Sequence, residues 1–303
     1  MRVSLSLPTH RVDLPSLLTA PSIMQVAAAA EAAGFDGLAV TEHPFPDEAW
    51  LLGGGHHALD PFVALAVAAA ATTRIRLHTN LLIAAYRNPF LAAKAVASLD
   101  AVSGGRVTLG IGAGYLEGEY RALGVDMTER NALTDEAIAA MRDAWTGGRV
   151  ERSGRRWSAA GNRMLPVPAQ AGGPPVWIGG NAPRAVRRAI EVGDGWVPML
   201  ASAGVSGRVR TVPVAMSDLA DRVAEVRAGV DGSRPRPFDV AVSPPGGGLD
   251  GGASPNELID AAGALVRAGV TWLTIGVPGR SLGAILDAIG ETGSQVLPAI
   301  AGL

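Results

Sequence analysis

The sequence predicts an α/β protein of the (β/α)8 barrel (TIM barrel) class, with one domain over residues 1–303. Strand-like and helix-like segments alternate eight times along the chain. The strand-like segments are apolar at nearly every position, which is typical of parallel strands buried on both faces. No stretch of linker composition divides the chain. Alternation of this length favours a closed barrel over a doubly wound open sheet.

One local phrase supports this prediction because it recurs: an alanine-rich helix, a glycine, and a short buried strand. It occurs as "AAAAEAAGFDGLAV", "RRAIEVGDGWVPM" and "GALVRAGVTWLTIG". We expect each glycine to end its helix with a positive φ. The eight strands are expected within 2–8, 27–40, 71–83, 99–112, 174–180, 187–199, 238–244 and 263–276.

The helices are expected between these strands, with one long interruption. They are expected at about 22–33, 61–72, 89–102, 128–145, 183–192, 216–229, 255–268 and 281–291. Segment 146–175 follows the fourth of them and has no helical pattern. We therefore expect an irregular insertion there, with a hairpin at "VERSGRRW".

Composition excludes several classes of function. The net charge is −2, so no basic field predicts nucleic-acid or anionic-membrane binding. Cysteine is absent, which excludes disulfides and thiolate metal sites. The N-terminus lacks the apolar run of a signal peptide, and the longest apolar run is too short for a bilayer. We expect a cytoplasmic protein that acts on a small molecule.

The stretch "LGIGAGYLEGEY" at residues 109–120 resembles a dinucleotide-binding fingerprint, but the spacing is wrong. After Gly110 and Gly112, the third glycine of that fingerprint is replaced by Tyr115. The stretch also belongs to the fourth strand, not the first. In a barrel, Gly112 and Gly114 lie at the mouth, where missing side chains let a bulky group approach the backbone.

Two other strand ends carry candidate chemistry. "TEHPFP" places His43 beside Glu42, a carboxylate able to orient the imidazole for proton transfer; the alternative is a solvated loop histidine. "IGGNAPRA" offers glycine amides, Asn181 as a helix N-cap and Arg184 as a cation, which suits a phosphate; the alternative is an ordinary capped helix. Adjacent His56 and His57 lack a third ligand at a metal-binding spacing, so no metal site is expected.

These residues give the chain a family resemblance. "EAAGFDGLAVTEHP", "RNPFLAAKAVASLDAVSGGRVTLGIGAGY" and "PPVWIGGNAPRAVRRAIEVGDGW" resemble the luciferase-like monooxygenase superfamily, and within it the branch of F420-dependent oxidoreductases. The resemblance covers most of residues 1–200 and weakens beyond them. It implies a barrel with a long insertion that holds a flavin or deazaflavin at its mouth, and a homodimer.

The resemblance also implies roles for individual residues. His43, with Glu42 beside it, would lie near the redox-active edge of the coenzyme. A non-proline cis peptide at Asn80–Leu81, after Thr79, would back the ring. The ring would be flanked by Gly112, Gly114 and Tyr115, and the phosphate of the coenzyme would be held by Gly179, Gly180, Asn181 and Arg184.

One departure limits what the resemblance implies about the substrate. Sugar-phosphate dehydrogenases of this superfamily carry a catalytic acid directly after the strand-four glycines, where this chain has Tyr115; Glu117 and Glu119 are displaced from that position. We therefore do not expect this chain to share the sugar-phosphate substrate or the proton-transfer scheme of those enzymes. The candidate catalytic residues are His43, Glu42 and Tyr115.

Three functions remain open at this stage. The first is hydride transfer between coenzyme F420 and a small organic substrate, which excludes monooxygenation because a deazaflavin carbon does not activate oxygen as FMN does. The second is an FMN-dependent monooxygenase. The third is a barrel that binds flavin or deazaflavin without turnover.

Overall fold

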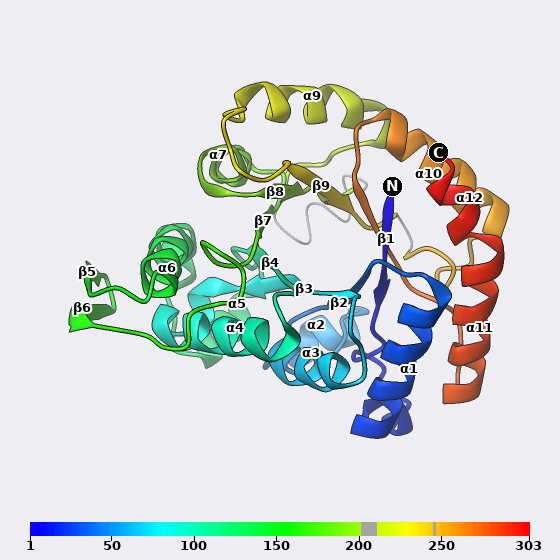
Figure 1. Ribbon diagram of the computed structural model, residues 1–303, viewed down its shortest axis with the longest axis horizontal. Helices are drawn as coiled ribbons and strands as arrows, with labels where there is room; N and C mark the ends of the chain where they lie inside the picture. Colours follow the sequence, from blue (N-terminus) through cyan, green and yellow to red (C-terminus); the bar gives the residue numbers. More distant parts are fainter. Residues whose placement is uncertain (201–210, 245–246) are drawn as a thin grey trace.

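Eight parallel strands form a closed barrel in the computed structural model, which describes residues 1–200, 211–244 and 247–303 (Figure 1). The order around the barrel is β1-β10-β9-β8-β7-β4-β3-β2. The strands are β1 (Arg2–Ser6), β2 (Gly37–Val40), β3 (Arg76–Ile83), β4 (Val107–Gly112), β7 (Val176–Gly179), β8 (Gly195–Val197), β9 (Asp239–Val242) and β10 (Trp272–Ile275). Each lies within its expected segment, so the (β/α)8 prediction is confirmed.

Helices surround the barrel and connect consecutive strands (Figure 1). The long ones are α1 (Ala20–Ala33), α3 (Pro61–Ala70), α4 (Pro89–Ser103), α6 (Arg130–Trp145), α7 (Pro183–Val192), α9 (Leu219–Gly229), α10 (Pro255–Arg267) and α11 (Leu282–Gln295). The short ones are α2 (Glu48–Leu52), α5 (Glu117–Ala122) and α12 (Leu297–Ala301). Sequence periodicity misses the short helices because each has fewer than two turns. Among the described residues, no helix has both the length and the hydrophobicity to cross a bilayer.

The recurring glycines stop their helices in two different ways. Gly34 after α1 and Gly269 after α10 have φ of +96° and +86°, as expected. The same expectation is wrong at Gly193 after α7, where φ is −86°. A Cβ at Gly193 would lie 2.9 Å from the carbonyl oxygen of Ala189 and 3.0 Å from the side chain of Ile178. Glycine is required there for close packing of helix against strand and not for a left-handed turn.

The insertion contains the expected hairpin. Strands β5 (Val150–Gly154) and β6 (Trp157–Asn162) pair antiparallel and form a sheet separate from the barrel (Figure 1). The ring of Trp157 packs edge-on against that of Phe90 at the start of α4, with centroids 5.0 Å apart. The hairpin is therefore anchored on the outer helices, away from the strand ends.

The barrel interior is closed below the mouth by large side chains. His78 of β3 lies edge-on to Trp177 and Trp272 and is within 2.8 Å of the Ser4 hydroxyl. Gly37 of β2 makes room for this imidazole, because a Cβ there would lie 2.2 Å from its Nε2. Burial lowers the pKa of His78 to about 3, so the ring is neutral at physiological pH. This layer separates the barrel mouth from the opposite end of the barrel.

Candidate active site

A cavity of about 690 Å3 lies at the carboxyl ends of the barrel strands. Most of the expected site residues line it: Glu42, His43, Asn80, Leu81, Gly112, Gly114, Tyr115, Gly179, Gly180 and Arg184. Thr79 and Asn181 do not; the Thr79 hydroxyl donates to the Gly110 carbonyl inside the sheet. Another cavity, of about 750 Å3, lies at the opposite end of the barrel. Barrel enzymes place their chemistry at the carboxyl end, so the first cavity is the candidate active site.

The peptide between Asn80 and Leu81 is cis, as the resemblance implies. It lies where the pairing of β3 with β4 shifts register, between Thr79 and Leu82. The side chain of Leu81 lies over two rim glycines: a Cβ would be 2.0 Å from Leu81 Cδ1 at Gly179 and 3.2 Å at Gly112. Glycine at these two positions leaves room for the Leu81 side chain. That side chain forms part of the cavity wall.

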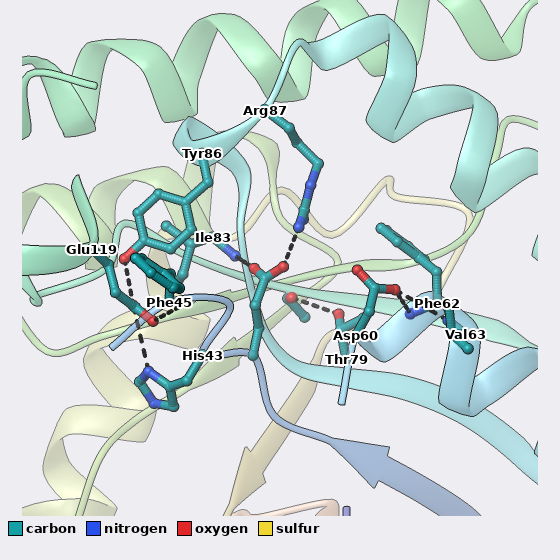
Figure 2. A network of polar contacts seen from close by, with 12 residues as sticks. His43, Phe45, Asp60, Phe62, Val63, Thr79, Ile83, Tyr86, Arg87 and Glu119 are labelled. Atoms are coloured by element: carbon teal, nitrogen blue, oxygen red, sulfur yellow. Dashed lines mark hydrogen bonds and ion pairs between the residues drawn. The ribbon is translucent and has the colours of Figure 1, made fainter. Parts of the chain in front are cut away.

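His43 faces a buried carboxylate that the sequence did not single out (Figure 2). Its Nδ1 lies 3.5 Å from Oε2 of Glu119, which is on α5 and 1% exposed. Glu119 also accepts hydrogen bonds from the Tyr86 hydroxyl at 2.9 Å and from the backbone N–H of Phe45 at 3.2 Å. Among the described residues, Nδ1 of His43 has no other polar partner. Because Nδ1 is directed at Glu119, Nε2 is the nitrogen left for a ligand.

Glu42 does not orient His43, so that expectation is wrong. The Glu42 carboxylate accepts the backbone N–H of Ile83 at 2.6 Å and forms an ion pair with Arg87 (Figure 2). Burial raises the pKa of Glu42, while Arg87 and the Ile83 N–H oppose the rise. The physical reason for the error is alternation: successive residues of an extended segment point to opposite sides.

Aromatic rings gather around His43. Its ring centroid lies 4.5 Å from that of Trp50, 4.9 Å from His56 and 6.1 Å from Tyr115. His10 approaches His56 from behind, at 5.8 Å. We call His43, His56 and Tyr115, which line the cavity, the ring wall, backed by Trp50 and His10. His57 is exposed, and no cluster of three potential metal ligands occurs in the described part of the chain.

The expected phosphate site differs from the prediction in its details. The N-cap of α7 is Ala182 and not Asn181. The buried Asn181 amide instead donates to the carbonyls of Met199 and Val212, at 2.8 and 2.7 Å, and its oxygen accepts the Met199 N–H at 2.9 Å. The Gly180 N–H donates to the carbonyl of Val197. Asn181 therefore ties together two loops that border the cavity.

Positive charge on this side of the cavity comes from Arg184 and Arg130. Arg184 forms an ion pair with Asp135 at 2.8 Å, and Asp135 also holds the buried Arg188 at 2.5 Å. Sequence reasoning missed Arg130 and did not single out the segment after β8. Val197, Pro198, Met199 and Leu200 supply much of the apolar wall. Apolar residues of a cavity wall form no polar motif, so the sequence alone does not distinguish them from core residues.

Comparison with known proteins gives the chain its relatives. A family model described as luciferase-like monooxygenase matches residues 1–237. The F420-dependent glucose-6-phosphate dehydrogenase of Gordonia bronchialis is 36% identical over 168 residues, which are 51% of this chain and 48% of that protein. The enzyme of the same name from Nocardia farcinica is 34% identical over 159 residues, 51% of this chain and 46% of that protein. The chain spans about half the length of the curated relatives it matches.

Solved structures share the fold over nearly the whole chain. Monooxygenase RslO1 from Streptomyces bottropensis superposes with a TM-score of 0.80 at 20% identity, covering 98% of this chain and 99% of that one. The coenzyme F420-dependent tetrahydromethanopterin reductase from Methanopyrus kandleri has a TM-score of 0.72 at 17% identity, covering 99% of both chains. At these identities the likeness establishes the fold alone.

Proposed function

Because the chain belongs to the luciferase-like monooxygenase family, we propose that it is an oxidoreductase that transfers a hydride between coenzyme F420 and a small organic substrate. The observation that carries the proposal is a cavity at the barrel mouth in which a histidine has one nitrogen directed at a buried carboxylate and the other available. The names of the curated relatives support F420 as the coenzyme.

The residues of the cavity fit such a coenzyme. Its volume lies within the range of small-molecule and cofactor sites. Leu81, Ile83 and the segment 197–200 give apolar walls for a planar ring system. Arg130 and Arg184 provide positive charge at one side, where the anionic tail of F420 would lie.

His43 is the residue we assign to proton transfer. With Glu119 ionised, Nδ1–H is the tautomer that the carboxylate favours, which leaves Nε2 as an acceptor. Nε2 then takes the proton from a substrate hydroxyl or, in the opposite direction, returns it to a carbonyl oxygen. We expect the 3.5 Å separation to shorten to a hydrogen bond when a ligand binds. Glu119 is thus a positioning residue and not a catalytic one.

Bound F420 supplies the hydride chemistry, accepting or giving one hydride at a ring carbon. The protein contributes the orientation of the substrate, a shielded apolar site and the proton path through His43. Tyr115 also lines the cavity, and burial raises its pKa to about 12, so its hydroxyl remains a hydrogen-bond donor at neutral pH.

Substitution of His43 tests this assignment. We expect His43→Ala to bind F420 as the parent protein does and to lower turnover by about 10²-fold or more. The matched control is His57→Ala, because His57 is exposed and does not line the cavity. Unchanged turnover in His43→Ala would remove His43 from the chemistry. Absence of turnover in the parent protein, with F420 bound, would instead support a carrier.

A further inference from the structure

The ring wall beside His43 carries no charge that is free to meet a charged ligand. We infer that the site takes an uncharged substrate, an alcohol or its carbonyl counterpart, at the ring wall, and excludes sugar phosphates and carboxylates. This inference rests on the proposed function and adds the substrate class to it. It also separates this chain from the relatives named as glucose-6-phosphate dehydrogenases.

His56 of the ring wall and His10 behind it are uncharged at neutral pH. Burial, together with the neighbouring histidines, lowers the pKa of His56 to about 4. Burial also lowers the pKa of His10 behind it, and Arg11 adds to that effect. Both rings can therefore hydrogen-bond as neutral groups but cannot neutralise an anion.

The carboxylates near His43 are already bound to protein donors. Glu119 is shared by His43, the Tyr86 hydroxyl and the Phe45 N–H. Glu42 is held by Arg87 and the Ile83 N–H. Neither carboxylate is available to pair with a cationic substrate, so a cation is excluded as well as an anion.

Two arginines line the same cavity, Arg130 at the start of α6 and Arg184, and neither belongs to the ring wall. The Arg130 guanidinium donates to the carbonyl of Met127. Arg184 follows β7, whereas His43 follows β2. Strands β4 and β3 lie between β7 and β2 in the barrel. The Arg184 guanidinium is paired with Asp135. Arg11 is the cation near His10, and it is bound to Asp13 and to the carbonyl of Gly279. Arg11 lines a separate cavity of about 220 Å3.

The cost of removing water from a ligand at the ring wall favours uncharged ligands over charged ones. A phosphate or carboxylate at the ring wall would lose its hydration shell without gaining a cation, which strongly disfavours binding. An uncharged ring or branched chain loses little hydration and can pack against the rings of His56 and Tyr115, which line the cavity. Its one oxygen can hydrogen-bond with Nε2 of His43.

Calorimetric titration of the F420-loaded protein with matched pairs tests the inference. The uncharged probes are cyclohexanol, cyclohexanone, benzyl alcohol and glucose. Their charged counterparts are 4-hydroxycyclohexanecarboxylate, 4-oxocyclohexanecarboxylate, 4-(hydroxymethyl)benzoate and glucose 6-phosphate. We expect at least one uncharged probe to bind about tenfold or more tightly than its counterpart. Equal or tighter binding of every counterpart, or no binding of any uncharged probe, would overturn the inference.

A substitution that adds charge to the ring wall gives a second, independent arm. His56→Lys should gain about tenfold in affinity for the charged probes, because it supplies the missing cation. The matched control is His57→Lys, which adds the same charge at the adjacent exposed position and should leave both affinities unchanged. Failure of His56→Lys to gain affinity would contradict the inference. Retention of F420 through gel filtration is measured first: its failure refutes the proposed function, whereas retained F420 with tight anion binding refutes the inference alone.

Discussion

Nδ1 of His43 lies 3.5 Å from Oε2 of Glu119, and the same carboxylate oxygen accepts the hydroxyl of Tyr86 (Figure 2). The first residue follows β2, the second is on α5 and the third follows β3. Three adjacent strand ends of the barrel therefore meet at one buried carboxylate. The orientation of the imidazole depends on side chains from all three connections.

Substitution of Glu119 should impair chemistry more than binding. Glu119→Gln keeps the size of the side chain and an oxygen for the Phe45 N–H, but it removes the charge that favours Nδ1–H of His43. We expect kcat to fall about 10- to 100-fold, the affinity for F420 to stay within about twofold, and the pH profile of kcat to change. Steady-state kinetics across pH, with fluorescence titration of F420, measures all three.

The control for Glu119 is on the same helix. Glu117→Gln removes a carboxylate from an exposed position and should leave kcat and its pH profile as in the parent protein. Loss of thermal stability without any change in the pH profile of Glu119→Gln would mean that Glu119 is only structural.

Binding of the anionic tail of the coenzyme should depend on Arg184. Arg184→Ala removes a guanidinium from the cavity wall, and the loss of one charge-assisted hydrogen bond predicts a Kd for F420 about tenfold higher. Arg187→Ala removes the same charge from an exposed position on α7 and is the matched control. Fluorescence titration at low and high salt checks the result; equal Kd values for the two variants would exclude Arg184 from the coenzyme site.

Acid stability should depend on Glu31, whose carboxylate accepts the backbone N–H groups of Thr73, Arg74 and Ile75 before β3. Burial opposes ionisation, but these bonds prevail and lower the pKa of Glu31 to about 2, from 4.5. A lowered native pKa stabilises the fold above pH 4.5, and this contribution is lost as the pH falls towards 2.

We expect Glu31→Gln to lower the free energy of unfolding at pH 7 by about 1 to 2 kcal/mol, with allowance for solvent screening. The difference between the two proteins should shrink below pH 4.5. Urea unfolding at a series of pH values measures it, and a difference that stays constant from pH 7 to pH 2 would contradict the account.

The barrel could be predicted because its determinants are local. Each strand is a short apolar run next to a helix stop, and this pattern recurs along the chain. The cis peptide at Asn80–Leu81 could be predicted only through the family resemblance, since neither residue has a local preference for it. The homodimer stays a prediction; Val63, Leu91 and Val102 give helices α3 and α4 exposed apolar positions compatible with it.

The contacts of the site could not be predicted because they join distant segments. Sequence adjacency suggested that Glu42 orients His43. Alternation instead turns Glu42 toward Arg87, and the carboxylate that faces His43 is Glu119 from α5. Asn181 looked like an N-cap because it precedes Pro183 and a helical pattern. Its amide instead meets the carbonyls of Met199 and Val212, which no local signal marks.

The central claim, that the cavity beside His43 holds F420, is tested most directly by coenzyme binding to protein purified from a host that lacks F420. We predict a colourless protein that binds added F420 stoichiometrically and does not release it to excess FMN, as followed by absorbance after gel filtration. A yellow protein that retains FMN through purification and ignores added F420 would contradict the claim and favour the FMN-dependent monooxygenase.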